Sequence, residues 1–164
     1  MKKKMIYPLI MLFVIALDQI TKYMVRSSME PGSSIPVLGN LLRICYVQNT
    51  GTAFSMFAGN RFITIFLTSI LIIGCIFYTV REIKEGHRAI PLLLSCVAAG
   101  GISNMIDRLT QGFVTDMISC GSFAVFNVAD MFISCGCILL MILVLLLYRE
   151  ESASERTEKG DSNE

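Results

Sequence analysis

The sequence contains no tryptophan, a single histidine and few charged residues, which make up 16% of its 164 positions. Positive and negative charges nearly cancel, to a formal net charge of +1, so the chain lacks the basic field that attracts nucleic acid. Soluble domains usually carry more charge than this, and hydrophobic residues here reach 54% of the chain. The shortage of charge therefore predicts a membrane protein with no nucleic-acid partner.

The hydrophobic residues gather in four uncharged runs, at Met5–Leu17, Phe62–Val80, Ala89–Ile106 and Met131–Tyr148. About 20 apolar residues are enough to cross a bilayer as a helix, and the first run reaches this length if a charged pair, Asp18 and Lys22, is tolerated within it. The N-terminus is basic and then apolar, as in a signal peptide, but no small-residue cleavage site follows. We therefore predict an all-α membrane protein of four transmembrane helices, at about 5–25, 62–80, 89–107 and 128–148, within one domain spanning 1–148.

Lysine and arginine residues concentrate at the N-terminus, between the second and third predicted helices, and after Tyr148. An excess of these residues marks the cytoplasmic side of a membrane protein. We expect both termini and the 81–88 turn to be cytoplasmic, which places the 27–60 segment and the 107–130 loop outside. Residues 149–164 are polar and lack apolar periodicity, so they are predicted to form a disordered cytoplasmic tail.

The predicted outer segment 27–60 begins with a loop rich in proline and glycine. Two runs suited to strands follow, Ile35–Leu38 and Leu41–Val47, with Gly39 and Asn40 between them, and this arrangement predicts a hairpin. A lone hairpin is only marginally stable, so we expect it to rest on the membrane surface or on the helices. Further on, a turn is predicted at 48–54, with the apolar side chains of Phe54, Met56 and Phe57 dipping into the interface.

Three aspartates, Asp107, Asp116 and Asp130, lie in the second outer segment, between two apolar runs. Acidic side chains are costly at a membrane, so they indicate a functional site. The alternative is that Asp107 and Asp116 mark solvated helix ends. Asp130 does not fit that alternative, because it stands at the edge of an apolar run. It also follows Asn127 at the spacing of a capping box that would open the fourth helix.

Asp18 and Lys22 are four residues apart on the first predicted helix, so they share a face and can pair. One interpretation is a structural ion pair near the outer interface. The other is that the pair orients the outer segments or a substrate.

The candidate chemistry is narrowed by the single histidine, His87, which is predicted to be cytoplasmic. Its position argues against Ser-His or Cys-His catalysis and against a histidine-ligated metal on the outer face. Paired carboxylates remain. Two aspartates held close together share one proton, so that one acts as base and the other as acid. The spacing alone leaves open which two of the three aspartates form this pair.

Six cysteines are present, and four of them fall in predicted helices, where they serve as small hydrophobic residues. Cys45 and Cys120 are both predicted to face outward. The sequence leaves open whether they form a disulfide.

Five ordered motifs resemble those of bacterial lipoprotein signal peptidases, the signal peptidase II family. They are Asp18-Gln-Ile-Thr-Lys22, Gln48-Asn49-Thr-Gly51-Thr-Ala53-Phe54, Gly100-Gly-Ile-Ser-Asn104-Met-Ile-Asp107-Arg108, Gly112-Phe-Val-Thr-Asp116 and Phe126-Asn127-Val-Ala129-Asp130. The resemblance implies an aspartic endopeptidase that removes signal peptides from prolipoproteins, cutting just before a cysteine that carries a diacylglyceryl group. It needs no metal and no organic cofactor.

The resemblance also assigns roles to residues. It implies a catalytic dyad of Asp116 and Asp130, and substrate-binding or supporting positions at Asp18, Lys22, Asn49, Gly100, Asn104, Arg108, Asn127 and Ala129. Two features depart from the family. Ser103 stands where glycine is usual, and the segment between the two dyad aspartates is short and lacks tryptophan and histidine.

These observations lead to one main hypothesis. The substrate's signal helix lies among the membrane helices, and the scissile amide reaches the dyad at the outer interface of a bacterial cell-membrane protein that acts as a monomer. Asp130 is expected to be the ionised aspartate, because the dipole at a helix N-terminus favours a negative charge. Two other classes remain as alternatives: a small transporter or ion-binding protein that uses the same aspartates, and a non-catalytic assembly subunit.

Overall fold

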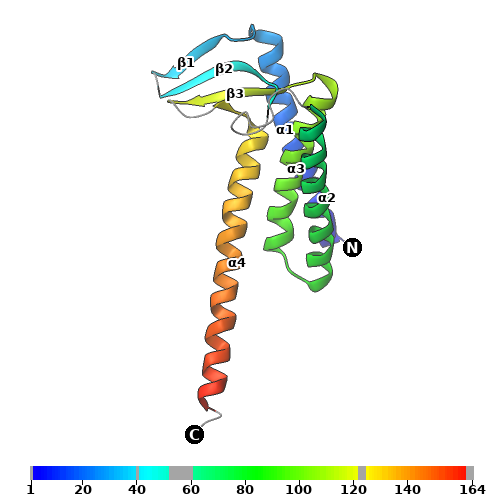
Figure 1. Ribbon diagram of the computed structural model, residues 1–164, viewed down its shortest axis with the longest axis vertical. Helices are drawn as coiled ribbons and strands as arrows, with labels where there is room; N and C mark the ends of the chain where they lie inside the picture. Colours follow the sequence, from blue (N-terminus) through cyan, green and yellow to red (C-terminus); the bar gives the residue numbers. More distant parts are fainter. Residues whose placement is uncertain (1, 40, 52–60, 122–124, 162–164) are drawn as a thin grey trace.

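In a computed structural model, four long helices form a bundle that is closed at one end by a small antiparallel sheet (Figure 1). The structure describes residues 2–39, 41–51, 61–121 and 125–161. Its elements are a short 3-10 helix at Lys2–Met5, then α1 (Ile6–Ser28), β1 (Ser34–Leu38), β2 (Leu42–Asn49), α2 (Arg61–Glu85), α3 (Ala89–Thr110), β3 (Val114–Cys120), β4 (Val125–Phe126) and α4 (Val128–Asp161).

All four α-helices are long and apolar enough to cross a membrane. The spans run over Ile6–Ser28, Phe62–Glu85, Ala89–Thr110 and Val128–Glu150, so the predicted fold class is confirmed. The apolar stretches of α1, α2 and α4 point mostly outward, with only 6% of that of α4 buried, whereas 56% of that of α3 is buried. An exposed apolar surface of this kind is stable when lipid replaces water around it.

α3 is the central helix, and it packs against α1, α2 and α4. Two glycines allow α3 and α4 to approach closely. A Cβ atom at Gly100 would lie 2.7 Å from the carbonyl oxygen of Ala129, and one at Gly136 would lie 2.8 Å from the side chain of Val97. Small residues at such contacts let membrane helices pack backbone to backbone, which here holds the start of α4 against α3.

The sheet has the strand order β1-β2-β3-β4, with every pair antiparallel. The predicted hairpin is confirmed as β1 and β2. β3 was not predicted, because the 107–130 segment was expected to be a loop. It inserts between β2 and the two-residue β4. The register between β2 and β3 is irregular between Ile44 and Val47, next to the pairing of Val47 with Asp116.

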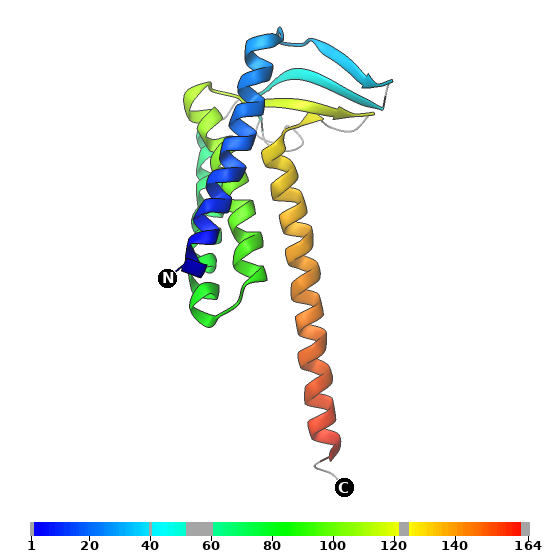
Figure 2. The same cartoon turned by 180° about the vertical axis from the view of Figure 1, so that it is seen from behind.

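The N-terminus, the turn between α2 and α3, and the C-terminus all lie away from the sheet, toward the opposite end of the bundle (Figure 2). The predicted disorder after Tyr148 is wrong for most of that segment, because α4 continues to Asp161. Extending an existing helix by one residue costs far less than nucleating a new one, and the segment is rich in Glu, Ala and Arg, which favour helices. The predicted interfacial contacts of Phe54, Met56 and Phe57 lie outside the described residues.

Candidate active site

Asp116 and Asp130 reach the same place from different elements. Asp116 is the third residue of β3, and Asp130 lies in the first turn of α4. Asn127, just before α4, bridges them: its side-chain Nδ2 donates to Asp116 Oδ1 at 2.7 Å, and its backbone N–H donates to Asp130 Oδ2 at 3.3 Å. The fold therefore holds the two carboxylates on either side of one asparagine.

The start of α4 is a capping box, as predicted. The Oδ1 of Asn127 accepts the backbone N–H of Asp130 at 2.9 Å, while the carboxylate of Asp130 accepts the backbone N–H of Asn127. Each residue satisfies an amide that the helix end would leave unpaired. The same bonds that begin the helix therefore fix the orientation of the Asp130 carboxylate.

Two further asparagines complete the surroundings of the carboxylates. Asn49, at the end of β2, donates to Asp116 Oδ2 at 2.9 Å, and its own Oδ1 accepts the backbone N–H of Gly51. Asn104, on α3, donates to Asp130 Oδ1 at 2.8 Å. Each of the four carboxylate oxygens thus accepts a hydrogen bond from an amide, which restrains both side chains.

Asp116 is 2% exposed, and its burial raises the pKa of that carboxyl from the ordinary value of 3.8 to about 6. The nearby charge of Asp130 contributes to this rise, whereas hydrogen bonds from Asn49 and Asn127 and the charge of Lys22 oppose it. A carboxyl with such a pKa gains and loses its proton near neutral pH, which suits general acid-base chemistry.

A buried ion pair lies directly behind the carboxylates. Lys22 Nζ is 2.7 Å from Asp18 and 3.3 Å from Asp107, and it donates to Asn104 Oδ1 at 2.8 Å. An ammonium group has three donors, and these three partners use all of them. Because Lys22 occupies the oxygen of Asn104, the amide nitrogen of Asn104 is left to face Asp130. The predicted pairing of Asp18 with Lys22 is confirmed.

Asp18 links this ion pair to the start of α4. Its Oδ1 accepts the backbone N–H of Ala129 at 2.8 Å, and its Oδ2 accepts the hydroxyl of Ser103 at 2.7 Å. Ser103, the departure from the family pattern, thus supplies a hydrogen bond that glycine could not. Ala129 contributes its backbone N–H, and Gly100 contributes the space beside it.

Arg108 lies at the edge of the site, where its guanidinium makes two long hydrogen bonds, each of 3.4 Å, to the carbonyl oxygens of Asn104 and Gly51. All the predicted site residues are therefore brought together. Asp107, expected to be structural or solvated, is not solvated: it is 1% exposed and paired with Lys22 and Arg26.

Sequence reasoning missed three contributors to this cluster: Gln19, Arg26 and Thr115. Gln19 donates to Asp107 and Ser103, and Arg26 donates to Asp107 and Thr115. Arg26 follows Lys22 at the same four-residue spacing that revealed the pair with Asp18, so helical periodicity could have found it. No local signal identifies Thr115.

Cys45 and Cys120 carry free thiols in the structure. They lie on adjacent strands, but Cys120 pairs with Leu42 rather than with Cys45. The disulfide left open by the sequence is therefore not formed.

The helices are long enough to cross a membrane, and a small sheet closes one end of the bundle over two carboxylates that accept hydrogen bonds from amides. These features define a multi-pass membrane protein with a paired-carboxylate site. The profile described as Signal peptidase (SPase) II matches residues 10–146. The chain therefore belongs to the signal peptidase II family and is a peptidase of the bacterial membrane.

Relatives and solved structures agree with this assignment. The chain is 37% identical over 149 residues to a lipoprotein signal peptidase of Shouchella clausii, covering 90% of this chain and 98% of that protein. Identity to the lipoprotein signal peptidase of Streptococcus pneumoniae is 35% over 147 residues, covering 88% and 95%. For that of Bacillus subtilis it is 36% over 146 residues, covering 87% and 94%.

Two solved bacterial membrane enzymes, each 31% identical to this chain, superpose on it with TM-scores of 0.78 and 0.75. The matches cover 85% of this chain and 87% and 92% of theirs.

Proposed function

We propose that the protein is an aspartic endopeptidase that removes the signal peptide from diacylglyceryl-modified prolipoproteins, cutting just before the lipidated cysteine. Asp116 and Asp130 are its catalytic dyad. The observation that carries this proposal is the bridging of the two carboxylates by Asn127 at the sheet end of the helices. The relatives named lipoprotein signal peptidase support the choice of substrate.

In the proposed reaction the dyad holds one proton. The ionised carboxylate takes a proton from water, and the water oxygen attacks the scissile carbonyl carbon while the protonated carboxyl donates its proton to the carbonyl oxygen. The C–N bond then breaks as the amide nitrogen receives the proton taken from water. One hydroxyl of the tetrahedral intermediate returns its proton to the carboxylate that had donated one, which leaves a carboxylic acid, an amine and a dyad that again holds one proton. Asp116, with its pKa raised to about 6 by burial, would hold the shared proton. Asp130, at the helix N-terminus, would be the base.

The charges around the dyad support a single shared proton. Three cations face four carboxylates in this cluster, and they are Lys22, Arg26 and Arg108 against Asp18, Asp107, Asp116 and Asp130. Neutralising one carboxyl with a proton balances the cluster, which lowers the cost of burying it. Neither the proposed steps nor the residues around the dyad call for a metal or an organic cofactor.

The sheet supports a position at the outer membrane interface. Ile35, Ile44, Ile118 and Phe126 pair in sequence across the four strands. Side chains two residues apart on a strand share a face, so Ile118 lies on the face that carries Asp116. We propose that this apolar face rests on the bilayer, that the signal helix of the substrate lies among the membrane helices, and that its lipid stays in the membrane. We also propose that the protein acts as a monomer.

The decisive experiment is cleavage of a diacylglyceryl-modified precursor by the purified protein in detergent, with a chelator present and no ion gradient. A peptidase releases the signal peptide under these conditions. A transporter that used the same aspartates would need a sealed membrane and would release no peptide, and an assembly subunit would tolerate Asp→Asn changes at the dyad. Precursor left uncut by folded protein would overturn the proposal.

The proposed orientation has its own test. Reporter tags at Gly86 and after Glu164 should read as cytoplasmic, and tags at Ser33 and near Gly121 should read as external. A cytoplasmic signal near Gly121 would contradict the orientation, because the dyad would then face the cytoplasm, on the opposite side of the membrane from the proposed cleavage site.

A further inference from the structure

Asp107 is the most heavily hydrogen-bonded acid in the described part of the protein, yet the proposed reaction gives it no role. Its carboxylate is 1% exposed. Three side chains of α1 donate to it or pair with it, and these are Gln19 at 3.1 Å, Lys22 at 3.3 Å and Arg26 at 3.3 Å. A fourth donor comes from β3: the backbone N–H of Thr115, at 3.0 Å from Asp107 Oδ2.

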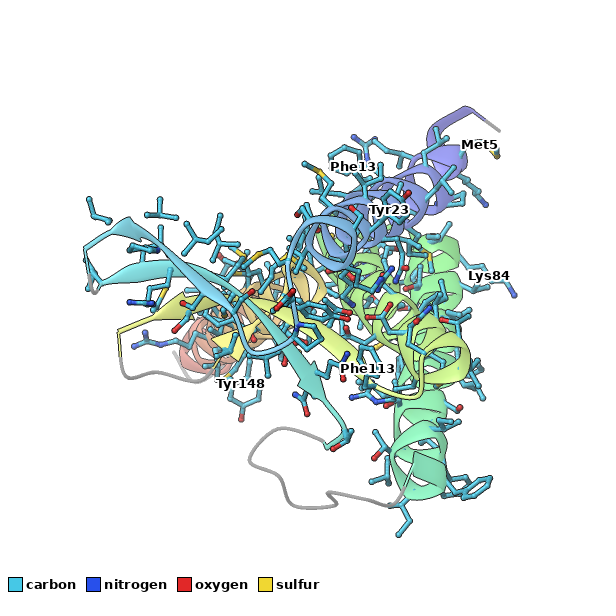
Figure 3. The ribbon with its side chains drawn as sticks, turned by 90° about the horizontal axis from the view of Figure 1, so that it is seen from above. Met5, Phe13, Tyr23, Lys84, Phe113 and Tyr148 are labelled. Carbon is cyan, nitrogen blue, oxygen red and sulfur yellow. The ribbon has the colours of Figure 1, made fainter. Side chains whose placement is uncertain are left out.

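The fourth contact is the informative one, because Thr115 immediately precedes Asp116. Thr115 is fully buried and is held at two points. Its N–H donates to Asp107, and its Oγ1 accepts from Arg26 Nη1 at 3.1 Å, the same guanidinium nitrogen that pairs with Asp107. Viewed from the sheet side, Phe113, near the start of β3, lies beside the end of α3 (Figure 3).

Around Thr115 the sheet pairs with β3 along one edge only. β4 pairs only with Ile118 and Ser119, so it does not reach Thr115. On the other edge, Thr115 pairs with Gln48 of β2, and the ladder becomes irregular only beyond Asp116, between Val47 and Ile44. The carboxylate of Asp107 therefore accepts the Thr115 N–H on the edge of β3 that β4 does not reach.

Asp107 also acts on the second carboxylate. It shares Lys22 with Asp18, and Lys22 holds the oxygen of Asn104, whose nitrogen donates to Asp130. One buried carboxylate is thus connected to Asp116 through Thr115 and to Asp130 through Lys22 and Asn104.

We propose that Asp107 is a positioning residue of the dyad: through the backbone N–H of Thr115 and through Lys22 it sets the separation and orientation of the Asp116 and Asp130 carboxylates. Arg26 assists by holding the Thr115 hydroxyl. This inference rests on the proposed function. The alternative is a purely structural role for Asp107. In that role it would only tie α1 to α3 and would affect the amount of folded protein but not its turnover.

The two roles can be separated by measuring kcat and KM. The measurement uses the purified, folded full chain and a lipidated precursor at a fixed ratio of detergent to substrate. Asp107→Asn keeps the side-chain shape but removes the negative charge and one acceptor. It should lower kcat about 10- to 100-fold and leave KM within about 2-fold, since a misplacement of about 1 Å can cost 10²-fold in rate. Some activity remains because both dyad carboxylates are still present.

A second pair of variants decides the question even if Asp107→Asn fails to fold. Thr115→Val keeps the shape and the strand preference of the residue but removes the acceptor for Arg26, whereas Thr115→Ser retains that acceptor. The valine variant should lose about 3- to 10-fold in kcat, a smaller cost than misplacement by a full ångström, and the serine variant should match the wild type.

Val14→Ala is the control for the packing of α1. It removes buried methyl groups but no hydrogen bond or ion pair of the cluster around the dyad, so it should lower Tm without changing kcat. Wild-type kcat in both Asp107→Asn and Thr115→Val, with Asp116→Asn inactive, would overturn this inference and leave the proposed function intact. A fully active Asp116→Asn would instead overturn the proposed function.

Discussion

The two ends of the helix bundle each carry an ion pair between residues four apart on one helix, with nearly the same length and in opposite surroundings. At the sheet end, Asp18 and Lys22 of α1 are 2.7 Å apart, and neither side chain is exposed. At the far end, Arg81 and Glu85 of α2 are 2.8 Å apart and are 58% and 42% exposed. The spacing indicates that a pair can form, but it does not reveal what the pair does.

The neighbours of each pair account for the difference. Lys22 also binds Asn104 and Asp107, and Asp18 holds the backbone of Ala129, so that pair connects three helices at the site. Near the far pair, His87 makes a short contact of 2.7 Å with Glu82, within the same exposed turn. Water and salt screen exposed pairs of this kind, which contribute little to stability. The contribution of each ion pair therefore depends on its burial. Substitutions at the two ends of the bundle should differ sharply in their effects on stability and on cleavage.

The largest effect is expected at the dyad. Asp116→Asn and Asp130→Asn should each abolish cleavage, a loss of about 10²- to 10⁴-fold or more, because no proton can then be shared and water is not activated. Each amide can still hydrogen-bond, so both variants should fold. Cleavage of lipidated precursor, followed by gel shift beside the Tm of each variant in detergent, measures both effects.

One pattern of results would reassign the dyad. If Asp107→Asn were inactive while Asp116→Asn stayed active, Asp107 would be a member of the dyad, although the family would still be right. If all three variants cleaved normally, the aspartic mechanism itself would have to be abandoned.

The next effect concerns the buried pair. Lys22→Met leaves Asp18 charged and unpaired in the interior, so the free energy of unfolding should fall by about 3–5 kcal/mol. Cleavage should fall as well, because the Asn104 side-chain oxygen loses the shorter of its two hydrogen bonds and keeps only the one from Asn127. The matched control is Arg81→Met in the exposed pair, which should leave both Tm and cleavage unchanged.

The double variant Asp18→Asn with Lys22→Met sharpens this comparison. Removing both charges should restore part of the stability lost in Lys22→Met, since no uncompensated charge remains buried. Equal losses of Tm in Lys22→Met and Arg81→Met would mean that burial does not determine how much each pair contributes to stability.

A smaller effect should appear in the pH dependence of stability. The pKa of Asp116 is raised by burial from 3.8 to about 6, so the folded state binds more protons than the unfolded state between these values. Stability attributable to this group therefore falls as pH rises through that window. Asp116→Asn lacks the group, and its Tm relative to wild type should be higher at about pH 7.5 than at about pH 4.5. A relative Tm that is the same at both pH values, or lower at the higher one, would contradict the burial of an ionisable Asp116.

Local patterns predicted several of these features correctly. The four spans follow from composition, the β1–β2 hairpin from the residues around Gly39, and the capping box from Asn127 and Asp130. Each of these depends on residues close together in sequence, whose geometry is set by the helix or strand itself.

Other features depend on contacts that the sequence does not specify locally. β3 pairs with β2, about 70 residues earlier in the chain, so the strand around Asp116 was interpreted as a loop. The periodicity of α1 places Asp18, Lys22 and Arg26 on one face, but it does not reveal that this face meets Asp107. The burial of Asp107 changes its expected role from a solvated helix end to an anchor of the site.

The smallest effect is expected where α4 leaves the bundle. The apolar span ends at Glu150, but the helix continues to Asp161, and Figures 1 and 2 show this part extending beyond the ends of the other helices. A helix end of this kind is stabilised by its own i to i−4 hydrogen bonds, and it lies at the opposite end of α4 from Asp130. Stopping the chain after Glu151 should therefore leave precursor cleavage in membranes nearly unchanged. Stopping it after Leu140, within the span, provides the contrast, because too few apolar residues remain for α4 to cross the bilayer, and both protein level and cleavage should fall. If the chain ending at Glu151 accumulated normally but no longer cleaved, the last turns of α4 would have a role in the reaction, and the functional contrast between the two ends of the bundle would no longer hold.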